Sequence, residues 1–290
     1  MCFDIKNKGE LEDSQILKIF RINHYLSFSA NLVHLHIEFT IDEYFLSLKK
    51  TFMVGIIVVI IISWLILRFI STEQLTVLGI KPSRNRFIEF AAGFLLTAIV
   101  CFINLFWQAH FKGITYTPNP DYGIMDALMG VWWTVRAVLF EELVFRGAIL
   151  YLLIRKIGIV KACLLDALIF GIYHWFSYEM FGGSIIAMIY ILLVTGAAGW
   201  MFAYAFAKTK SLFAPFGLHF GWNLISIVVL SSGPLGNQLF IPNGAAIELG
   251  GWTTLLFFLW QVMVAPGIVT WYLTKRYSRA ISKDTSQGQL

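Results

Sequence analysis

Phe140-Glu141-Glu142-Leu143-Val144-Phe145-Arg146 places two adjacent carboxylates and an arginine inside a largely apolar run that extends from Ile124 to Leu153. A charged side chain at bilayer depth costs several kcal/mol unless it is paired or faces a wet cavity. Ionisable groups in such a run are therefore candidates for a functional role.

The spacing of these three charged side chains predicts a division of roles. Glu142 and Arg146 stand at positions i and i+4 of a helix, where a carboxylate pairs well with a cation one turn later. Glu141 points about 100° away around the same helix. It needs a separate partner, which suits a carboxyl group that acts as a base. The alternative is a structural ion network, including Arg136, that locks helices together without chemistry.

The composition is typical of a polytopic membrane protein. Of the 290 residues, 58% are hydrophobic and 13% are charged, and the mean hydropathy is +0.72. We therefore predict an all-α fold, a polytopic membrane helix bundle of about seven to eight transmembrane helices. The net charge of +5 comes from short clusters beside apolar runs, so we expect no nucleic-acid partner. Cys2, Cys101 and Cys163 lie far apart, which favours packing roles over a disulfide or zinc site.

Seven apolar segments are candidates to cross about 30 Å of hydrocarbon as helices. They comprise residues 52–70, 87–109, 124–153, 160–176, 184–207, 212–230 and 252–274. The predicted domain organisation is a peripheral N-terminal extension at 1–50, a transmembrane domain at 51–275 with its motif core at 75–230, and a basic cytoplasmic tail at 276–290.

Lysine and arginine residues alternate between the two sides of the predicted membrane domain. They cluster in the first, third and fifth loops and in the C-terminal tail, whereas the even loops hold only Lys112. The positive-inside rule then places the odd loops and the C-terminus in the cytoplasm. Membrane lipids are the expected partners of the outer helix faces.

A stripe of small residues marks the fifth predicted span. Gly199, Ala203 and Ala207 recur every four residues. Such a stripe lets a neighbouring helix approach closely, so it predicts helix packing rather than chemistry.

Two further polar motifs lie in other predicted spans. Phe170-Gly171-Ile172-Tyr173-His174 ends the fourth span, and His219-Phe220-Gly221-Trp222-Asn223 lies in the sixth. Within the second motif, the histidine and the asparagine are one helical turn apart on one face.

The polar residues of the three motifs have similar predicted depths. Counted from the cytoplasmic ends of their spans, the depths are roughly 18, 21, 10 and 16 Å for Glu141, His174, His219 and Asn223. This agreement favours one shared cavity. Asp166, two turns before His174, is another ionisable group, and the sequence does not identify its partner.

A carboxylate, two imidazoles and a carboxamide suit the attack of water on an amide. Glu141 would take a proton from water, with His174 orienting it. His219 and Asn223 would donate hydrogen bonds to the oxyanion. The same set could instead hold a divalent metal such as zinc through Glu141, His174 and His219, with one position open for water. The sequence fits both a metal-dependent and a metal-free reaction.

These motifs resemble those of the CPBP family of intramembrane proteases, also called the Abi or type II CAAX prenyl protease family. The family pattern is Glu-Glu-x-x-x-Arg, then Phe-x-x-x-His, then His-x-x-x-Asn, and this chain has all three in order. The similarity extends over about residues 75 to 230 and includes the linker Leu78-Gly79-Ile80-Lys81-Pro82.

The resemblance implies an intramembrane endopeptidase whose first glutamate, Glu141, activates water. His174, His219 and Asn223 would complete its catalytic site, and Glu142 with Arg146 would support it. Family members act on peptide or membrane-protein substrates, including lipidated ones, and many are bacterial. We therefore expect a multi-pass protein of a bacterial cell membrane.

Two other classes of function also fit parts of the pattern. A proton-coupled transporter could use Glu141, Glu142 and His174 as a proton relay, but we find no paired repeats or matching broken helices. A non-catalytic membrane scaffold, such as a bacteriocin-immunity accessory, would not need every polar member of the three motifs.

Overall fold

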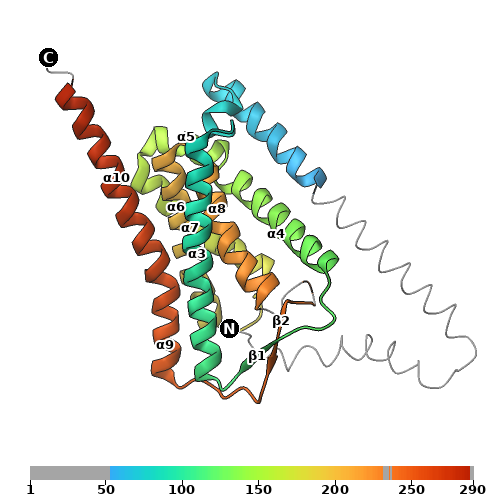
Figure 1. The fold of residues 1–290 in the computed structure, drawn as a ribbon. Helices are drawn as coiled ribbons and strands as arrows, with labels where there is room; N and C mark the ends of the chain where they lie inside the picture. Colours follow the sequence, from blue (N-terminus) through green and yellow to red (C-terminus); the bar gives the residue numbers. More distant parts are fainter. Residues whose placement is uncertain (1–52, 231–234, 236, 288–290) are drawn as a thin grey trace, which may run out of the picture. The chain divides into compact units, whose positions relative to one another are not determined.

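The computed structural model describes residues 53–230, 235 and 237–287, and these residues form a helical bundle with one short pair of strands (Figure 1). The predicted extension at 1–50 lies outside the described residues. The elements, in chain order, are the helix Met53–Ser71, which ends in the π-helical turn η2 (Leu67–Ser71), η3 (Leu75–Leu78), α3 (Arg84–Phe111), β1 (Thr115–Pro118), α4 (Ile124–Phe145), α5 (Ala148–Ile157), α6 (Ile159–Ser177), α7 (Ile185–Thr209), α8 (Phe213–Asn223), η4 (Leu224–Val229), β2 (Phe240–Asn243), α9 (Gly251–Leu259), η5 (Trp260–Val264) and α10 (Ala265–Gln287).

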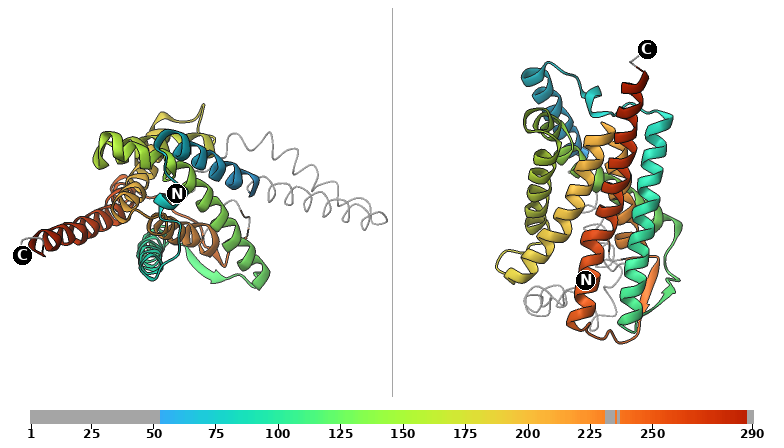
Figure 2. Two further views of the ribbon diagram at one scale, coloured as in Figure 1. Left: turned by 90° about the horizontal axis from the view of Figure 1, so that it is seen from above. Right: turned by 90° about the vertical axis from the view of Figure 1, so that its left-hand side faces the viewer.

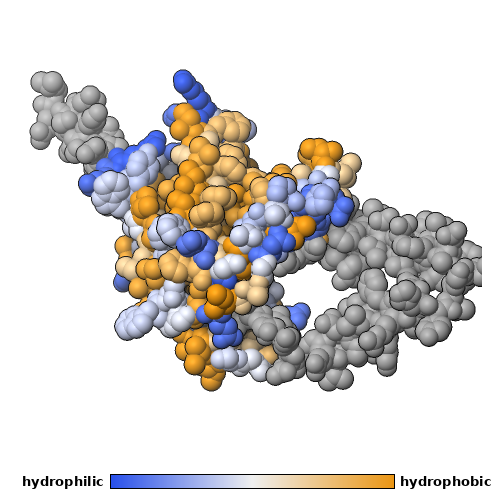
Figure 3. Space-filling view, turned by 60° about the horizontal axis from the view of Figure 1, so that its bottom comes forward, coloured by the Kyte–Doolittle hydropathy of each residue, from blue (hydrophilic) through white to orange (hydrophobic). Residues whose placement is uncertain are grey.

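The described residues confirm the predicted all-α membrane bundle. Five of their helices are long and apolar enough to cross a membrane: Met53–Ser71, α3, α6, α7 and the continuous segment Gly251–Tyr277. Hydrophobic residues cover much of the described surface in Figure 3. The exposed ones include Ile57, Phe102 and Leu164, on three different helices. Large apolar side chains in such positions fit contact with lipid.

Helix α4 is also largely apolar, but it carries four charged residues, Asp126, Arg136, Glu141 and Glu142. All four lie within the predicted span 124–153, and Arg136 and Glu142 are buried. Charged side chains in such a segment normally face the interior of the bundle. α4 is therefore the helix that presents the candidate site.

The third predicted span, 124–153, is not one helix, and this detail of the prediction is wrong. α4 ends at Phe145 and α5 begins at Ala148. A side chain at Gly147 would collide with the carbonyl oxygen of Leu143, so the chain bends at a glycine. The last turn before the bend is intact, because the Arg146 amide donates to the Glu142 carbonyl oxygen over 2.8 Å. The two side chains therefore keep their i, i+4 relation.

Close backbone contact fixes α8 against α3. A Cβ at Gly221 would collide with the carbonyl oxygen of Phe94, so only glycine permits this approach. Thr97 on α3 also donates a hydrogen bond from Oγ1 to the Leu218 carbonyl oxygen over 2.6 Å. These contacts hold the segment of α8 that carries His219.

The small-residue stripe on α7 packs as the sequence predicts. A Cβ at Gly199 would lie 3.1 Å from the Ala167 Cα and 3.0 Å from a ring atom of Phe170, both on α6. Helices α6 and α7 consequently run in close contact.

Residues 72–83, called the elbow from here on, join the helix Met53–Ser71 to α3 and contain η3. The elbow packs on the turn between α7 and α8. Gly79 follows η3 with φ 67°, a left-handed conformation that favours glycine. The Leu212 amide donates to the Leu78 carbonyl oxygen over 3.1 Å, and Ser211 Oγ donates to the Gly79 carbonyl oxygen over 3.3 Å. This elbow lies at the end of the bundle away from the antiparallel pair β1 and β2 (Figures 1 and 2).

Candidate active site

Arg146 is the centre of a buried ionic cluster. Its side chain is fully buried where α4 bends, and its Nη1 lies 3.4 Å from Glu142 Oε1. Its Nη2 donates to the Gly199 carbonyl oxygen on α7 over 3.1 Å. Its Nε lies 3.3 Å from Asp166 Oδ2 on α6, an ion pair without hydrogen-bond alignment. Arg146 thus supplies the partner of Asp166 that the sequence did not identify, and it links three helices.

His219 lies between the two adjacent glutamates. Its Nδ1 is 2.8 Å from Glu142 Oε1, a hydrogen bond between two buried side chains. Its Nε2 is 3.7 Å from Glu141 Oε2, which is beyond ordinary hydrogen-bond length. Glu142 is 1% exposed, whereas Glu141 is 19% exposed. The carboxylate that the sequence assigns to catalysis is therefore the more accessible and less tightly held of the two.

Aromatic rings surround Arg146 and His219. The guanidinium carbon lies 4.3 Å from the centre of the Phe170 ring and 5.1 Å from that of Phe202. The Phe202 ring stacks on the His219 ring at 4.6 Å with an interplanar angle of 16°. These rings exclude water from the ionic cluster, which strengthens its electrostatic interactions.

His174 is held through one ring nitrogen by its own helix. Its Nδ1 lies 2.8 Å from the Phe170 carbonyl oxygen, and because a carbonyl can only accept, Nδ1 must carry the proton. This leaves Nε2 as the nitrogen that can accept a hydrogen bond from a substrate or a water molecule. The Phe170 ring lies 4.5 Å from the His174 ring and 6.0 Å from the His219 ring. One phenylalanine therefore contacts both predicted catalytic imidazoles.

Asn223 is the last residue of α8, one turn after His219. It is half-buried, and no hydrogen bond of its carboxamide appears among the described residues. The carboxamide donors are thus available to a bound group. Of the predicted site residues, the structure joins Glu141, Glu142, Arg146 and His219 directly, connects His174 through Phe170, and places Asn223 on the helix of His219.

The predicted metal ligands do not form a ready metal site in this geometry. Among the described residues, no group of three or more histidine, cysteine, aspartate or glutamate side chains is arranged to hold a metal ion. His219 Nδ1 contacts Glu142 and His174 Nδ1 contacts its own backbone, which leaves Nε2 of each ring as the nitrogen open to a ligand. The metal-dependent alternative stays a prediction.

Two contributors to the cluster were not predicted from the sequence: Phe202 and the Gly199 carbonyl group. Phe202 is an ordinary core residue by its sequence context, and no local signal marks its contact with His219. Gly199 belongs to the predicted small-residue stripe. That stripe correctly indicates close packing, but it does not show that the buried Gly199 carbonyl oxygen accepts a hydrogen bond from Arg146.

Comparison with known proteins finds two similarities at the level of sequence. A family model described as type II CAAX prenyl endopeptidase Rce1-like matches residues 123–225, from the start of α4 to just after Asn223. All three motifs lie within that range. The matched segment of the chain is therefore similar to the CPBP family. At family level it is a membrane peptidase of the CAAX-protease type.

A similar protein supports the same assignment over a longer stretch of the chain. The protein named "Putative membrane peptidase YdiL" of Bacillus subtilis (strain 168) is 28% identical over 192 residues, which cover 64% of this chain and 73% of that protein. No solved structure matches the chain.

Proposed function

We propose that this chain is an intramembrane endopeptidase of the CPBP type, in which Glu141 activates the attacking water. The observation that carries the proposal is the position of His219 between Glu142, at 2.8 Å, and Glu141, at 3.7 Å. A buried, neutralised carboxylate holds the imidazole, and a second, accessible carboxylate faces it. Such a pair of carboxyl groups in different environments suits one supporting and one reacting role.

In the first proposed step, Glu141 removes a proton from water while the water oxygen forms a bond to the amide carbonyl carbon. The available Nε2 of His174 accepts a hydrogen bond from the other O–H of the water and so orients the nucleophile. Glu141 becomes a neutral carboxylic acid, and the negative charge moves to the former carbonyl oxygen. No other residue needs to change its covalent state.

In the proposed intermediate, His219 and Asn223 stabilise the oxyanion. When both ring nitrogens of His219 carry protons, Nδ1 donates to Glu142 and Nε2 donates to the oxyanion. The Asn223 carboxamide, one turn later on α8, supplies a second donor. The C–N bond then breaks as Glu141 returns its proton to the leaving nitrogen, which produces a carboxylic acid and an amine and restores the Glu141 carboxylate. The proton of the new carboxylic acid then passes to the amine, which leaves a carboxylate and an ammonium group.

The proposed substrate is a peptide or a membrane protein, with or without a lipid, because the site lies among helices that cross the bilayer. We also propose that the C-terminus is cytoplasmic and that the host membrane is a bacterial cell membrane. A reporter fused to the C-terminus would test the orientation by its accessibility to protease in intact cells.

The decisive experiment compares Glu141→Gln with the unmodified protein, reconstituted in lipid vesicles with internally quenched peptides, prenylated and unprenylated. The amide cannot act as a base, so we expect cleavage to fall by about 10²–10⁴-fold, the usual contribution of a general base. The thermal unfolding temperature should change little, because Glu141 is the less tightly held carboxylate.

The matched control is Glu248→Gln, which makes the same chemical change at an exposed position outside the candidate site. It should cleave normally. Full activity of Glu141→Gln would remove the base assignment. A scaffold or a proton-coupled transporter would instead show no cleavage even by the unmodified protein.

A further inference from the structure

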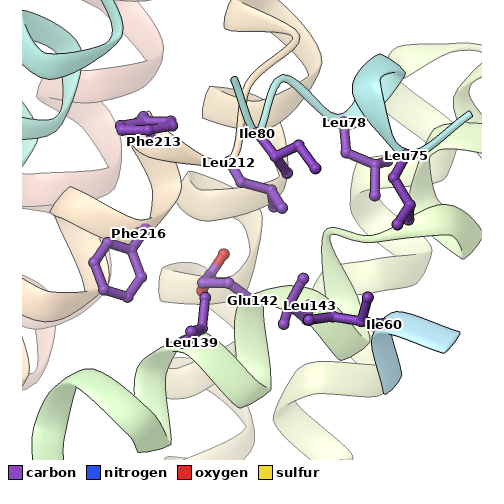
Figure 4. A pocket seen from close by; sticks show the side chains of 10 residues that line it. All are labelled: Ile60, Leu75, Leu78, Ile80, Leu139, Glu142, Leu143, Leu212, Phe213 and Phe216. Atoms are coloured by element: carbon purple, nitrogen blue, oxygen red, sulfur yellow. The ribbon is translucent and has the colours of Figure 1, made fainter. Parts of the chain in front are cut away.

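An apolar cavity of about 410 Å³ lies between the elbow and α4 (Figure 4). Its walls come from the elbow, α4, the start of α8 and the helix Met53–Ser71, and nine of its ten lining side chains are apolar. In Figure 4, Leu75 and Leu78 of the elbow lie across the cavity from Leu139 on α4. The volume lies within the usual range of small-molecule sites, about 300–1,000 Å³.

The one polar side chain in the cavity wall, Glu142, belongs to the ionic cluster. Its Oε1 contacts His219 at 2.8 Å and Arg146 at 3.4 Å, and its side chain is 1% exposed. An occupant therefore has to match the apolar walls only. A hydrocarbon chain does so, whereas water would lack hydrogen-bond partners there, and large apolar cavities stay dry.

The rim of the cavity reaches the surface of the bundle. Two of its wall residues, Ile60 and Ile80, are 36% and 41% exposed. Ile60 belongs to a helix that is long and apolar enough to cross a membrane. A hydrocarbon chain from the surrounding lipid can therefore reach the cavity without crossing the packed core of the bundle.

Four basic residues, called the elbow cations from here on, border the elbow side of the cavity: Lys81, Arg84, Arg86 and Lys210. Lys81 is the next residue after Ile80, so its Cα is about 3.8 Å from that of a wall residue. The Arg86 guanidinium donates to the Lys81 carbonyl oxygen. The Lys210 carbonyl oxygen would lie only 2.3 Å from a Cβ at Gly79, which directly precedes Ile80. These three cations therefore start from backbone that touches the cavity wall.

The fourth cation, Arg84, begins α3. It stands one turn before Phe87, whose ring packs edge-on against the wall residue Phe213 at 5.5 Å. The first turn of α3 holds Arg84 and Arg86 but no acidic residue. The positive end of a helix dipole disfavours cations, so a bound anion would stabilise this arrangement.

The elbow cations have no ion pair with a carboxylate among the described residues. The carboxylate of the elbow itself, Glu73, pairs with Arg155 on α5 at 3.2 Å. Glu89, the first acidic residue of α3, accepts a hydrogen bond from the Tyr277 hydroxyl over 3.3 Å. The acidic residues of the elbow and of α3 thus have other partners, and the elbow cations present a net positive charge.

We propose that an anionic phospholipid binds here, with an acyl chain in the cavity and its phosphate on the elbow cations. The cavity supplies apolar walls for the chain, and the four basic side chains supply the charge complementary to the phosphate. Binding of this kind requires no hydrolysis, so it can be tested without the proposed peptidase reaction.

The test is native mass spectrometry of the full chain in detergent micelles, which counts the phospholipid molecules that stay bound. Dioleoyl phosphatidylglycerol and dioleoyl phosphatidylcholine have the same chains, but only the first carries a net negative charge. We expect phosphatidylglycerol to be retained about tenfold more, with a smaller difference at high salt. Glycerol 3-phosphate, which has the phosphate without the chains, should not displace it.

A pair of double variants tests the headgroup contacts. Lys81→Gln with Lys210→Gln removes two of the elbow cations and should lower retention of phosphatidylglycerol about tenfold. The matched control is Lys156→Gln with Lys161→Gln, which removes the same charge from two exposed lysines on α5 and α6 that do not line the cavity. The control should retain the lipid normally.

A second pair of variants tests the chain contacts. Ile80→Trp fills the rim of the cavity from a partly exposed position, so we expect it to fold and to lower retention as much as the double variant. The control is Ile149→Trp on α5, since Ile149 is 56% exposed and does not line the cavity. The thermal unfolding temperature of each variant, measured without added lipid, checks that it is folded.

Three outcomes would overturn the proposal. Equal retention of the two lipids would show that the site does not recognise an anionic headgroup. Equal losses in the two double variants would assign the effect to the general surface charge. Unchanged retention in Ile80→Trp would show that the cavity does not hold the chain. None of these outcomes bears on whether Glu141 is the base, so the two proposals fail separately.

Discussion

The inner ionic cluster and the outer reaction face of the candidate site are built differently. The inner cluster joins Arg146, Glu142 and Asp166 at 3.3–3.4 Å, with side chains no more than 6% exposed. On the outer face, Glu141 is 19% exposed, its distance to His219 is 3.7 Å, and Asn223 is half-buried. The difference fits the proposed roles, because rigid support lies behind the groups that are proposed to react, and those groups keep room to adjust to a substrate.

The largest effect on stability is expected when the central cation of the inner cluster, Arg146, is removed. Arg146→Met would leave Glu142 and Asp166 buried without their cation. Breaking a buried pair in this way costs about 3–5 kcal/mol. We expect a large loss of folded protein, measured as the yield and the thermal unfolding temperature in detergent.

The control for this prediction is Arg155→Met. Arg155 pairs with Glu73 at 3.2 Å, but both side chains are substantially exposed, at 55% and 36%. An exposed pair contributes about 0–1 kcal/mol. If the two variants lost stability equally, the inner cluster would not be the main support of the fold.

A smaller effect is expected when one anionic partner of the cation is neutralised. Asp166→Asn weakens one contact of Arg146 but leaves its contacts with Glu142 and the Gly199 carbonyl oxygen. We expect a loss of about 1–3 kcal/mol, measured by thermal or denaturant unfolding. The exposed Asp121→Asn serves as the control, and a loss at Asp166 no greater than at Asp121 would show that this ion pair adds nothing.

The smallest effect on stability is expected on the reaction face. Asn223→Ala removes a carboxamide without a hydrogen-bond partner among the described residues, so the free energy of unfolding should stay within about 0.5 kcal/mol. Cleavage should nevertheless fall by about 10²–10³-fold, the usual effect of losing an oxyanion donor. The measurement is the cleavage rate of the quenched peptides beside an unfolding curve. A large loss of stability with normal cleavage would reverse the roles assigned to the two regions.

Local sequence spacing was enough to predict the pairing of Glu142 with Arg146, because i, i+4 neighbours meet on any helix. It also indicated the close approach along Gly199, since small residues at a four-residue spacing pack in the same way in many membrane proteins. It did not predict the bend at Gly147, because the flanking residues read as one continuous apolar run.

Contacts between side chains on different helices could not be predicted from the sequence, for a different reason. The contacts of Arg146 with Asp166 and of Phe202 with His219 depend on how α4, α6, α7 and α8 cross. A one-residue shift in any of these helices would turn the side chain by about 100°. Sequence spacing fixes the face that a residue occupies on its own helix, but not the neighbour that it meets.

The amino-acid sequence alone determined the class of this protein: an apolar, all-α membrane chain with three polar motifs that resemble the CPBP pattern. Composition and local periodicity suffice for this, because the bilayer forces backbone groups to bond within helices. Only the tertiary structure decided that His219 stands between two unlike glutamates, and that Glu142 lines an otherwise apolar cavity. Those features arise where four helices pack together, and packing is a property of side-chain shapes across the whole bundle.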